Sequence, residues 1–243
     1  MKKILQVAIG LFCTVPLAVS ADIYNLADDF DYPNNPNADD WAYINAATSL
    51  PLSPFVPIND GNPVRPAAIT GFFSTGSSMN LNAPFVFKAA VSGAAAGLTN
   101  GDFLQGDAVV HSPNVAGSPL VIQWTAPEAG WIDFTSDIWY AHSSVDRINN
   151  VIIALNLDPL ASATISKTSH GNRDNAWHVA INDLAVNQGD SLKFLFSKAP
   201  NQQFGSLNGI AVTVEFTAIP EPGTASLLVT AGGLLGLMLR RRR

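Results

Sequence analysis

One stretch decides the fold: Ile210-Ala211-Val212-Thr213-Val214-Glu215-Phe216-Thr217. Every second residue in it is large and apolar, and the residues between are small or polar. Because successive side chains of a β-strand point to opposite faces, this alternation predicts a strand with one face buried and the other in solvent. It is the clearest strand signal in the chain.

Looser forms of the alternation recur upstream, between turns rich in Gly, Pro, Asn and Asp. We expect strands that bury the following sets: Leu120, Ile122 and Trp124; Ile132, Phe134 and Ile138; Val151, Ile153 and Leu155; Trp177, Val179 and Ile181; Leu192, Phe194 and Phe196. No convincing helix interrupts them. The sequence therefore predicts an all-β fold, an antiparallel β-sandwich that is jelly-roll-like, with a closed barrel as the alternative.

The first third of the chain is less regular. From Asp22 to about Val86 it carries many Pro and Asn residues, and we expect it to wrap the sandwich, with a short strand from Trp41 to Ile44. The small residues of Ala89 to Leu98 are consistent with a strand followed by a loop.

The N-terminal segment 1–21 has the layout of a signal peptide. Lys2 and Lys3 precede an uncharged run from Ile4 to Val15, and Val19-Ser20-Ala21 supplies the small residues of a cleavage site. A signal peptidase that cuts there would leave Asp22 as the mature start. The run is short for a membrane-spanning helix, which argues against an uncut anchor.

The C-terminal segment 220–243 is also distinct. In the motif Pro220, Glu221 and Pro222, the two prolines break any helix or strand that continues from the body. Residues 223–239 are uncharged and rich in Leu, Ala and Gly. Seventeen residues of helix span roughly 25 Å at about 1.5 Å per residue, which predicts a transmembrane helix. The basic cluster Arg240, Arg241, Arg242 and Arg243 follows at once, and we expect it to stay cytoplasmic.

Composition restricts what the body, residues 22–219, can do. Only seven of the 13 Lys and Arg residues but 18 of the 19 Asp and Glu residues lie there, a net charge of −11. So acidic a body argues against nucleic acid as a partner. The one cysteine, Cys13, lies in the signal segment, so we expect neither a disulfide nor a cysteine metal site in the body.

The order Pro220-Glu221-Pro222, apolar helix and terminal arginines resembles the PEP-CTERM sorting signal. This resemblance implies a Gram-negative bacterium that makes exopolysaccharide, and an exosortase in the inner membrane that recognises the tail and cuts it near the Pro-Glu-Pro. It implies an inner-membrane intermediate and a final place on the cell surface or in a biofilm matrix.

Three stretches of the body also resemble the β-sandwich that often accompanies this tail, a domain similar to carbohydrate-binding modules. They are Asp29-Phe30 with Asn35-Pro36-Asn37 and Trp41-Ala42-Tyr43, then Val121 to Gly130, and then Val186 to Asp190. The chain departs from that pattern at Phe204 to Gly209, where an Asp-rich loop is often seen.

An acidic patch near the start is a candidate metal site. Carboxylates at short intervals on a loop, with Asn residues between them, suit Ca²⁺, which prefers several oxygen ligands. The candidates are Asp28, Asp29, Asp31, Asp39 and Asp40. The spacing is not that of an EF-hand, and a solvated turn-rich loop is the alternative interpretation.

Exposed aromatic side chains are the usual platform for sugar rings, and five residues are candidates for glycan binding: Trp41, Tyr43, Trp131, Trp139 and Tyr140. Core packing is the alternative for each, because Trp is highly buried on average. Trp124 and Trp177 lie on the apolar sides of their predicted strands, so we expect them in the core.

Trp139 and Tyr140 are the strongest pair among these candidates. Adjacent residues of a strand point to opposite faces, so one of the two must face away from the core or lie under a loop. His142, Asp146 and Arg147 follow closely and are suited to binding hydroxyl groups.

The sequence offers little for catalysis. The four histidines lack metal-ligand spacing, and no nucleophile elbow is present. Asp133 and Asp137 share a strand face but would lie roughly 13 Å apart at about 3.3 Å per residue. That exceeds the roughly 5–9.5 Å between the carboxyls of a glycosidase.

Three hypotheses follow, in order of preference. The first is a non-catalytic surface or matrix protein whose body binds exopolysaccharide. The second is a structural or adhesive protein that acts through protein–protein contacts. The third is a glycan hydrolase.

Overall fold

A computed structural model describes residues 20–36, 40–54, 69–73, 83–90, 92–95, 98–99, 101–115, 117–142 and 145–219. The predicted tail 220–243 and residues 1–19 of the predicted signal peptide lie outside these ranges. Within them, no helix is long and apolar enough to cross a membrane. Residues 21–219 form one unit with its own core.

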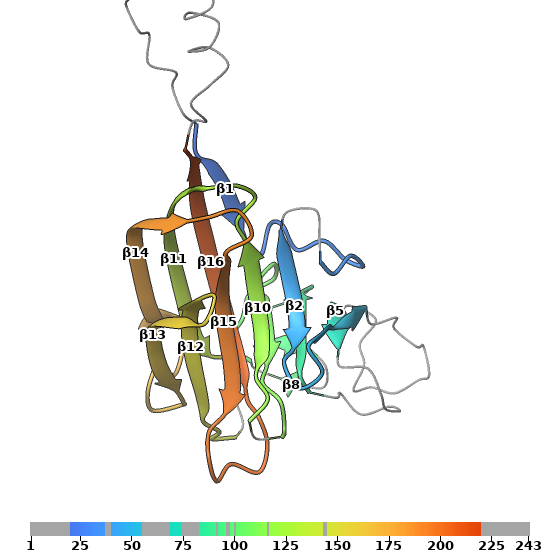
Figure 1. The fold of residues 1–243 in the computed structure, drawn as a ribbon. Coiled ribbons are helices and arrows are strands. Elements are labelled where there is room, and N and C mark those ends of the chain that lie inside the picture. Colours follow the sequence, from blue (N-terminus) through green and yellow to red (C-terminus); the bar gives the residue numbers. More distant parts are fainter. Residues whose placement is uncertain are drawn as a thin grey trace, which may run out of the picture. The chain divides into compact units, whose positions relative to one another are not determined.

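One layer of this unit is an eight-stranded sheet. Its order is β14 (Trp177–Val186), β11 (Gly130–Tyr140), β16 (Leu207–Ala218), β9 (Ala108–His111), β6 (Phe85–Ala89), β5 (Ile69–Phe73) and β4 (Ser53–Pro54), and β1 (Asp22–Asn25) also pairs with β16. Figure 1 shows β14, β11, β16 and β1 next to one another.

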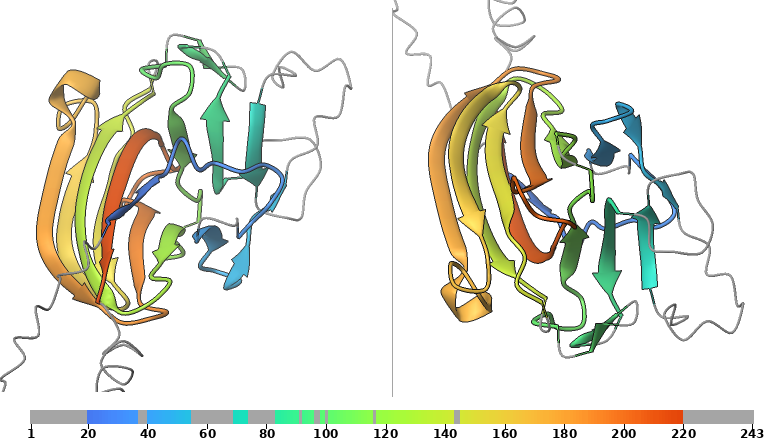
Figure 2. Two further views of the ribbon diagram at one scale, coloured as in Figure 1. Left: turned by 90° about the horizontal axis from the view of Figure 1, so that it is seen from above. Right: turned by 90° about the horizontal axis from the view of Figure 1, so that it is seen from below.

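The other layer is a six-stranded sheet. Its order is β13 (Asp158–Ile165), β12 (Asn149–Leu155), β15 (Ser191–Lys198), β10 (Leu120–Thr125), β2 (Trp41–Asn45) and β3 (Leu50–Pro51). A small hairpin joins β7 (Ala94–Ala95) to β8 (Leu98–Thr99), and η1 (Arg173–Asn175) is a short 3-10 helix. The strand pairs of the described residues are antiparallel. Because the strands form separate layers, visible end-on in Figure 2, the fold is a sandwich and the barrel alternative is wrong.

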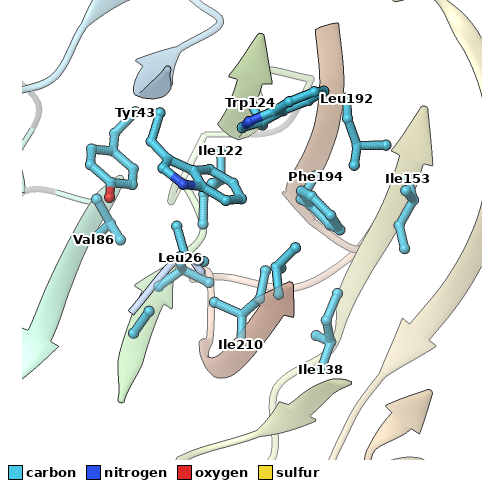
Figure 3. Close-up of a cluster of buried hydrophobic side chains, with 14 of the residues drawn as sticks. Leu26, Tyr43, Val86, Ile122, Trp124, Ile138, Ile153, Leu192, Phe194 and Ile210 are labelled. Atoms are coloured by element: carbon cyan, nitrogen blue, oxygen red, sulfur yellow. The ribbon is translucent and has the colours of Figure 1, made fainter. Parts of the chain in front are cut away.

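The main core lies between the two sheets. The predicted inward-facing sets meet there, including Ile122, Trp124 and Phe194 from one sheet and Phe134 and Ile210 from the other. Figure 3 shows Ile122, Trp124, Phe194 and Ile210 pointing into this shared interior. Phe134 and Phe194 join the sheets through an edge-to-face contact of 6.3 Å between ring centroids. The predicted alternation of the later strands is therefore confirmed.

A second, smaller apolar cluster covers part of the eight-stranded sheet on its outer side. It contains Phe85, Phe87, Ala89, Phe103, Val109, Trp139, Ala141 and Leu207. Strands β6 and β9 lie between the two clusters and are buried on both faces. Sequence alternation missed them for this reason, because a strand buried on both sides has no polar face.

The expectation for residues 22–86 was only partly right. The predicted short strand is β2, which is a full member of the six-stranded sheet. The rest does not simply wrap the sandwich, since β1 extends the eight-stranded sheet beside β16 and β5 pairs with β6. Short strands separated by Pro and Asn carry too few residues to show a period.

Candidate functional site

Four of the five aromatic candidates are buried. Trp41 and Tyr43 are 0% exposed, and Trp139 and Tyr140 are each 1% exposed. A fully covered ring has no face to offer a sugar, so the expectation that these residues form a surface platform is wrong. Trp124 is in the core as predicted. Trp177 is partly buried and packs against the edge of the core.

Trp41 and Tyr43 are buried because β2 turns them toward the sandwich interior. In the register of β2 with β10 they are opposite Trp124 and Ile122. The Tyr43 ring stacks on Phe72 of the other sheet, with 5.0 Å between centroids. These two residues therefore help to join the sheets.

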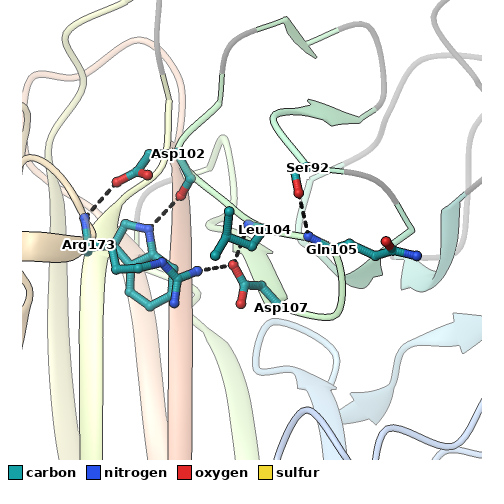
Figure 4. Close-up of polar contacts among 7 residues, drawn as sticks. Ser92, Asp102, Leu104, Gln105, Asp107 and Arg173 are labelled. Carbon is teal, nitrogen blue, oxygen red and sulfur yellow. Dashed lines mark hydrogen bonds and ion pairs between the residues drawn. The ribbon is translucent and has the colours of Figure 1, made fainter.

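Trp139 and Tyr140 do point to opposite faces of β11, but both faces are covered there. Tyr140 belongs to the main core and Trp139 to the second cluster. The loop at 101–107 closes over Trp139, whose Nε1 donates to the carbonyl of Asp102 at 2.6 Å. The Arg173 guanidinium lies 4.2 Å from the centroid of the Trp139 ring and forms an ion pair with Asp107. Figure 4 shows the polar contacts of Asp102, Asp107 and Arg173.

The polar residues beside Tyr140 are also used within the fold. The Arg147 Nη1 donates to the carbonyl of Gly205 at 2.9 Å, and its guanidinium lies 5.1 Å from the Phe204 ring. His142 is only 9% exposed, and burial followed by the nearby Arg147 lowers its pKa. Arg147 therefore joins two loops, and the His142 ring is largely covered.

Trp131 is the exception among the five candidates. It lies near the start of β11, where the sequence alternates buried and exposed positions, and it is 47% exposed. Its neighbours across the sheet are small, Ala185 on β14 and Thr217 on β16. The ring is therefore accessible from the outer side of the eight-stranded sheet.

A polar hollow lies on the same outer face. It has a volume of about 190 Å³, and its lining residues are Asp133, Phe134, Thr135, Asn182, Thr213 and Glu215. They come from three adjacent strands, β14, β11 and β16. Asp133 is two positions from Trp131, and side chains at that spacing share a strand face. This open surface therefore carries an aromatic ring, two carboxylates, two hydroxyl groups and an amide.

Asp133 is oriented by an irregularity in the sheet. The register between β11 and β14 shifts between Ile132 and Phe134, so Asp133 has no direct partner on β14. Its Oδ1 instead accepts from the backbone N–H of Asp183 at 2.7 Å. Across the other edge of β11, Asp133 is directly opposite Glu215. Both side chains are exposed.

Sequence reasoning missed Thr135, Asn182, Thr213 and Glu215 as one group. Alternation alone places Thr213 and Glu215 on the outer face of their strand, and Asn182 on the outer face of β14. It does not say which strands are neighbours or in which register. Only the pairing of Thr135 with Thr213 and of Asp133 with Glu215 brings them together.

The acidic patch near the start supports local structure in the part that the structure describes. Asp29 Oδ2 accepts from the Asn25 backbone N–H at 2.6 Å and from Trp41 Nε1 at 3.2 Å. Asp31 Oδ2 accepts from Asn34 at 2.7 Å. Among the described residues, no three His, Cys, Asp or Glu side chains are grouped to hold a metal ion. Asp39 lies outside the described residues, so calcium binding by the whole set of five stays a prediction.

No family model and no curated protein matches the chain. Among solved structures, the chain is similar to the C-terminal CBM6 of LamC, a marine laminarinase from Zobellia galactanivorans, with 16% identity over 44% of this chain and 79% of that chain and a TM-score of 0.27. It is also similar to the CBM36-1 domain of a multidomain xylanase from the hindgut metagenome of Trinervitermes trinervoides, with 10% identity, 74% and 98% coverage and a TM-score of 0.29.

An exo-β-1,3-galactanase from Phanerochaete chrysosporium is similar at 17% identity, over 44% of this chain and 23% of that chain, with a TM-score of 0.25. Scores this low do not establish a shared fold. The fold therefore rests on the strand pairing above, and the site on its own geometry.

Proposed function

We propose that this chain is a non-catalytic glycan-binding protein that binds exopolysaccharide on the outer face of β14, β11, β16 and β1. The observation that carries the proposal is the exposed ring of Trp131 beside the polar hollow. A sugar presents an apolar ring face and a rim of hydroxyl groups. An aromatic ring with adjacent carboxylates, hydroxyls and an amide complements both features.

Trp131 is preferred over a second exposed aromatic residue. That residue is Phe204, which is 42% exposed, but the Arg147 guanidinium lies over its ring. Trp131 has a larger ring and a hollow with five polar or charged lining residues next to it.

Binding of the purified full chain to insoluble and soluble polysaccharides tests the proposal. We expect Trp131→Ala to weaken glycan binding at least about tenfold, which corresponds to about 1.4 kcal/mol, without loss of folding. Phe204→Ala, at the second exposed aromatic residue, is the matched control and should bind normally. If neither wild type nor control binds any glycan and the protein instead assembles as its concentration rises, the adhesive alternative replaces this proposal.

The sequence features at the two ends support an export route within the same proposal. A signal peptidase removes 1–21, and an exosortase recognises Pro220, Glu221 and Pro222 in a chain held by the predicted 223–239 helix and its arginines. Intact-mass analysis of the protein from its native host tests this. A C-terminus near Glu221 on surface or matrix protein supports sorting and cleavage, whereas a mass that extends to Arg243 in the inner membrane indicates an uncut anchor.

One observation favours glycan hydrolysis as a second candidate. Asp133 and Glu215 are opposite each other and line the same hollow. The Cβ atoms of opposed residues lie about 4.5–5.5 Å apart, which allows the carboxyl groups to reach the roughly 5–9.5 Å separation of a glycosidase pair. Both side chains are exposed, whereas the acid of a glycosidase is held in a desolvated pocket, so we rank this function second. Release of reducing ends by wild type but not by Glu215→Gln would establish it.

A further inference from the structure

The strands that form the proposed glycan-binding face contain carboxylates but no lysine or arginine. These four strands are β14, β11, β16 and β1. They carry the carboxylates Asp133, Asp137, Asp183 and Glu215, together with Asp22, which is opposite the core residue Phe216 and therefore does not share the face of Glu215. The one titratable nitrogen among their side chains is that of His178, whose Nδ1 contacts Asp137 Oδ1 at 2.8 Å.

The strongest concentration of negative charge is at the hollow itself. Asp133 on β11 is directly opposite Glu215 on β16 in the register of the two strands, and both residues line the hollow. Like charges directly opposite each other on a sheet destabilise it. Asp133 Oδ1 accepts from the Asp183 N–H, which fixes one oxygen of this carboxylate on the β14 side. A cationic group seated between the two carboxylates would relieve their repulsion.

The hollow is also correctly placed for the next unit of a glycan. Asp133 is two residues from Trp131, about 7 Å along the strand at about 3.3 Å per residue. Thr135 and Asp137 continue the same face, so the polar track runs along β11 beyond the aromatic ring. One sugar on Trp131 would therefore place its neighbour above the carboxylates.

From these observations we infer that the face prefers glycans that carry amino groups, such as a glucosamine polymer, over neutral glycans, and that it disfavours glycans that carry carboxylates. This inference rests on the proposed glycan-binding function. A sugar ammonium is a hydrogen-bond donor and a positive charge, which complements the two carboxylates that line the hollow. A uronate polymer would bring its own carboxylates against this surface, where like charges repel.

The test compares three polymers at about pH 6: chitosan, its N-acetylated counterpart and polygalacturonate. The full chain is used in EDTA at low and at high salt. We expect chitosan to bind more tightly than the acetylated polymer, with a preference that shrinks as salt rises, and polygalacturonate to bind least. Each of Glu215→Gln and Asp133→Asn should reduce the chitosan preference about two- to fivefold, the range for an exposed charge pair of up to about 1 kcal/mol.

The controls separate this inference from the proposed function. Asp158→Asn, an exposed carboxylate of the other sheet, should leave the preference unchanged. If the acetylated polymer binds through Trp131 with no chitosan preference, or if Glu215→Gln and Asp133→Asn keep the preference, the inference fails and the proposed function stands. If no polymer binds and Trp131→Ala has no effect, both fail. Polygalacturonate binding that requires added Ca²⁺ would also overturn the inference, because the carboxylates would then act through a bridging metal.

Discussion

Trp131 and Trp139 show how one residue type takes two roles on one strand. They are eight residues apart, and both point to the outer face of β11. Trp131 is 47% exposed and Trp139 1% exposed. The difference comes from the covering loop at 101–107 and from Phe85 and Phe87, which lie only over the Trp139 end.

Truncation of the two rings should therefore have very different effects. Trp139→Ala removes a buried side chain and its hydrogen bond to Asp102, so we expect it to lower the free energy of unfolding by about 3–5 kcal/mol. Trp131→Ala should change it by no more than about 0.5 kcal/mol. Urea denaturation measures both values. Equal losses for the two variants would contradict the assignment of one ring to packing and the other to the surface.

Gly209 is needed because Trp139 lies against it. A Cβ at this position would overlap Cε2 and Cζ2 of the Trp139 indole, which is directly opposite on β11. We expect Gly209→Ala to cost about 1–3 kcal/mol of stability, as overpacking does. Ala211→Val, an exposed change two residues further on the same strand, is the control. If Ala211→Val loses as much stability as Gly209→Ala, the cause is a general sensitivity of β16 to larger side chains and not the contact with the Trp139 ring.

At the scale of elements, the loops next to Tyr140 are joined by a closed set of hydrogen bonds. Ser112 Oγ donates to Asn149 Oδ1 at 2.7 Å, Asn149 Nδ2 donates to the Ser206 carbonyl at 3.1 Å, and the Ser206 N–H donates to Ser112 Oγ at 3.0 Å. The three residues are fully buried. They fix the end of β9 and the starts of β12 and β16, strands of both sheets, relative to one another.

Removal of one member should leave buried polar groups without partners. We expect Asn149→Ala to reduce stability by about 1–3 kcal/mol, the cost of leaving buried polar groups unsatisfied. Its neighbour Asn150, whose side chain accepts from Thr164 on the exposed face, provides the matched control. Asn150→Ala should cost less than about 1 kcal/mol in the same thermal and urea unfolding measurements. The reverse order would mean that the three loops are held by other contacts.

At the scale of the whole molecule, a buried histidine links folding to pH. Burial lowers the pKa of His111 to about 4. The hydrogen bond from its Nδ1 to the Ser112 carbonyl, at 2.7 Å, acts in the opposite direction, and nearby Arg147 and His142 lower the pKa further. In the unfolded chain the pKa of a histidine is about 6.5. The fold therefore favours the neutral ring, and its contribution is fully present above about pH 6.5.

Stability should accordingly fall as the pH drops from about 6.5 to about 4. The His111 contribution to this loss is at most about 3 kcal/mol, and the lowered pKa of His142 acts in the same direction. Urea unfolding at several pH values measures how steeply the free energy of unfolding changes with pH. His111→Asn, which retains a donor at the Nδ1 position, should weaken this pH dependence, and His178→Asn on the exposed face should not. If His111→Asn leaves this pH dependence unchanged, other groups cause the loss of stability at low pH.

The candidate site was only partly predictable from sequence. Trp131 was among the predicted aromatic residues, and alternation placed Asp133 beside it on the same face. The choice between Trp131 and Trp139 required knowledge of what covers each end of β11. Thr213 and Glu215 joined the site only through the register of β11 with β16, which no local pattern encodes.

What the sequence determined by itself is the class of fold and the direction of most side chains. A period of two fixes which residues of β10, β11, β15 and β16 are buried, because pleating is a local property of the backbone. Only the tertiary structure decided the rest: that β6 and β9 lie between two apolar clusters, that Trp139 is enclosed while Trp131 is open, and that Asp133 and Glu215 meet in one hollow. Those outcomes depend on contacts between segments far apart in the chain, and the local alternation of residues carries no information about such contacts.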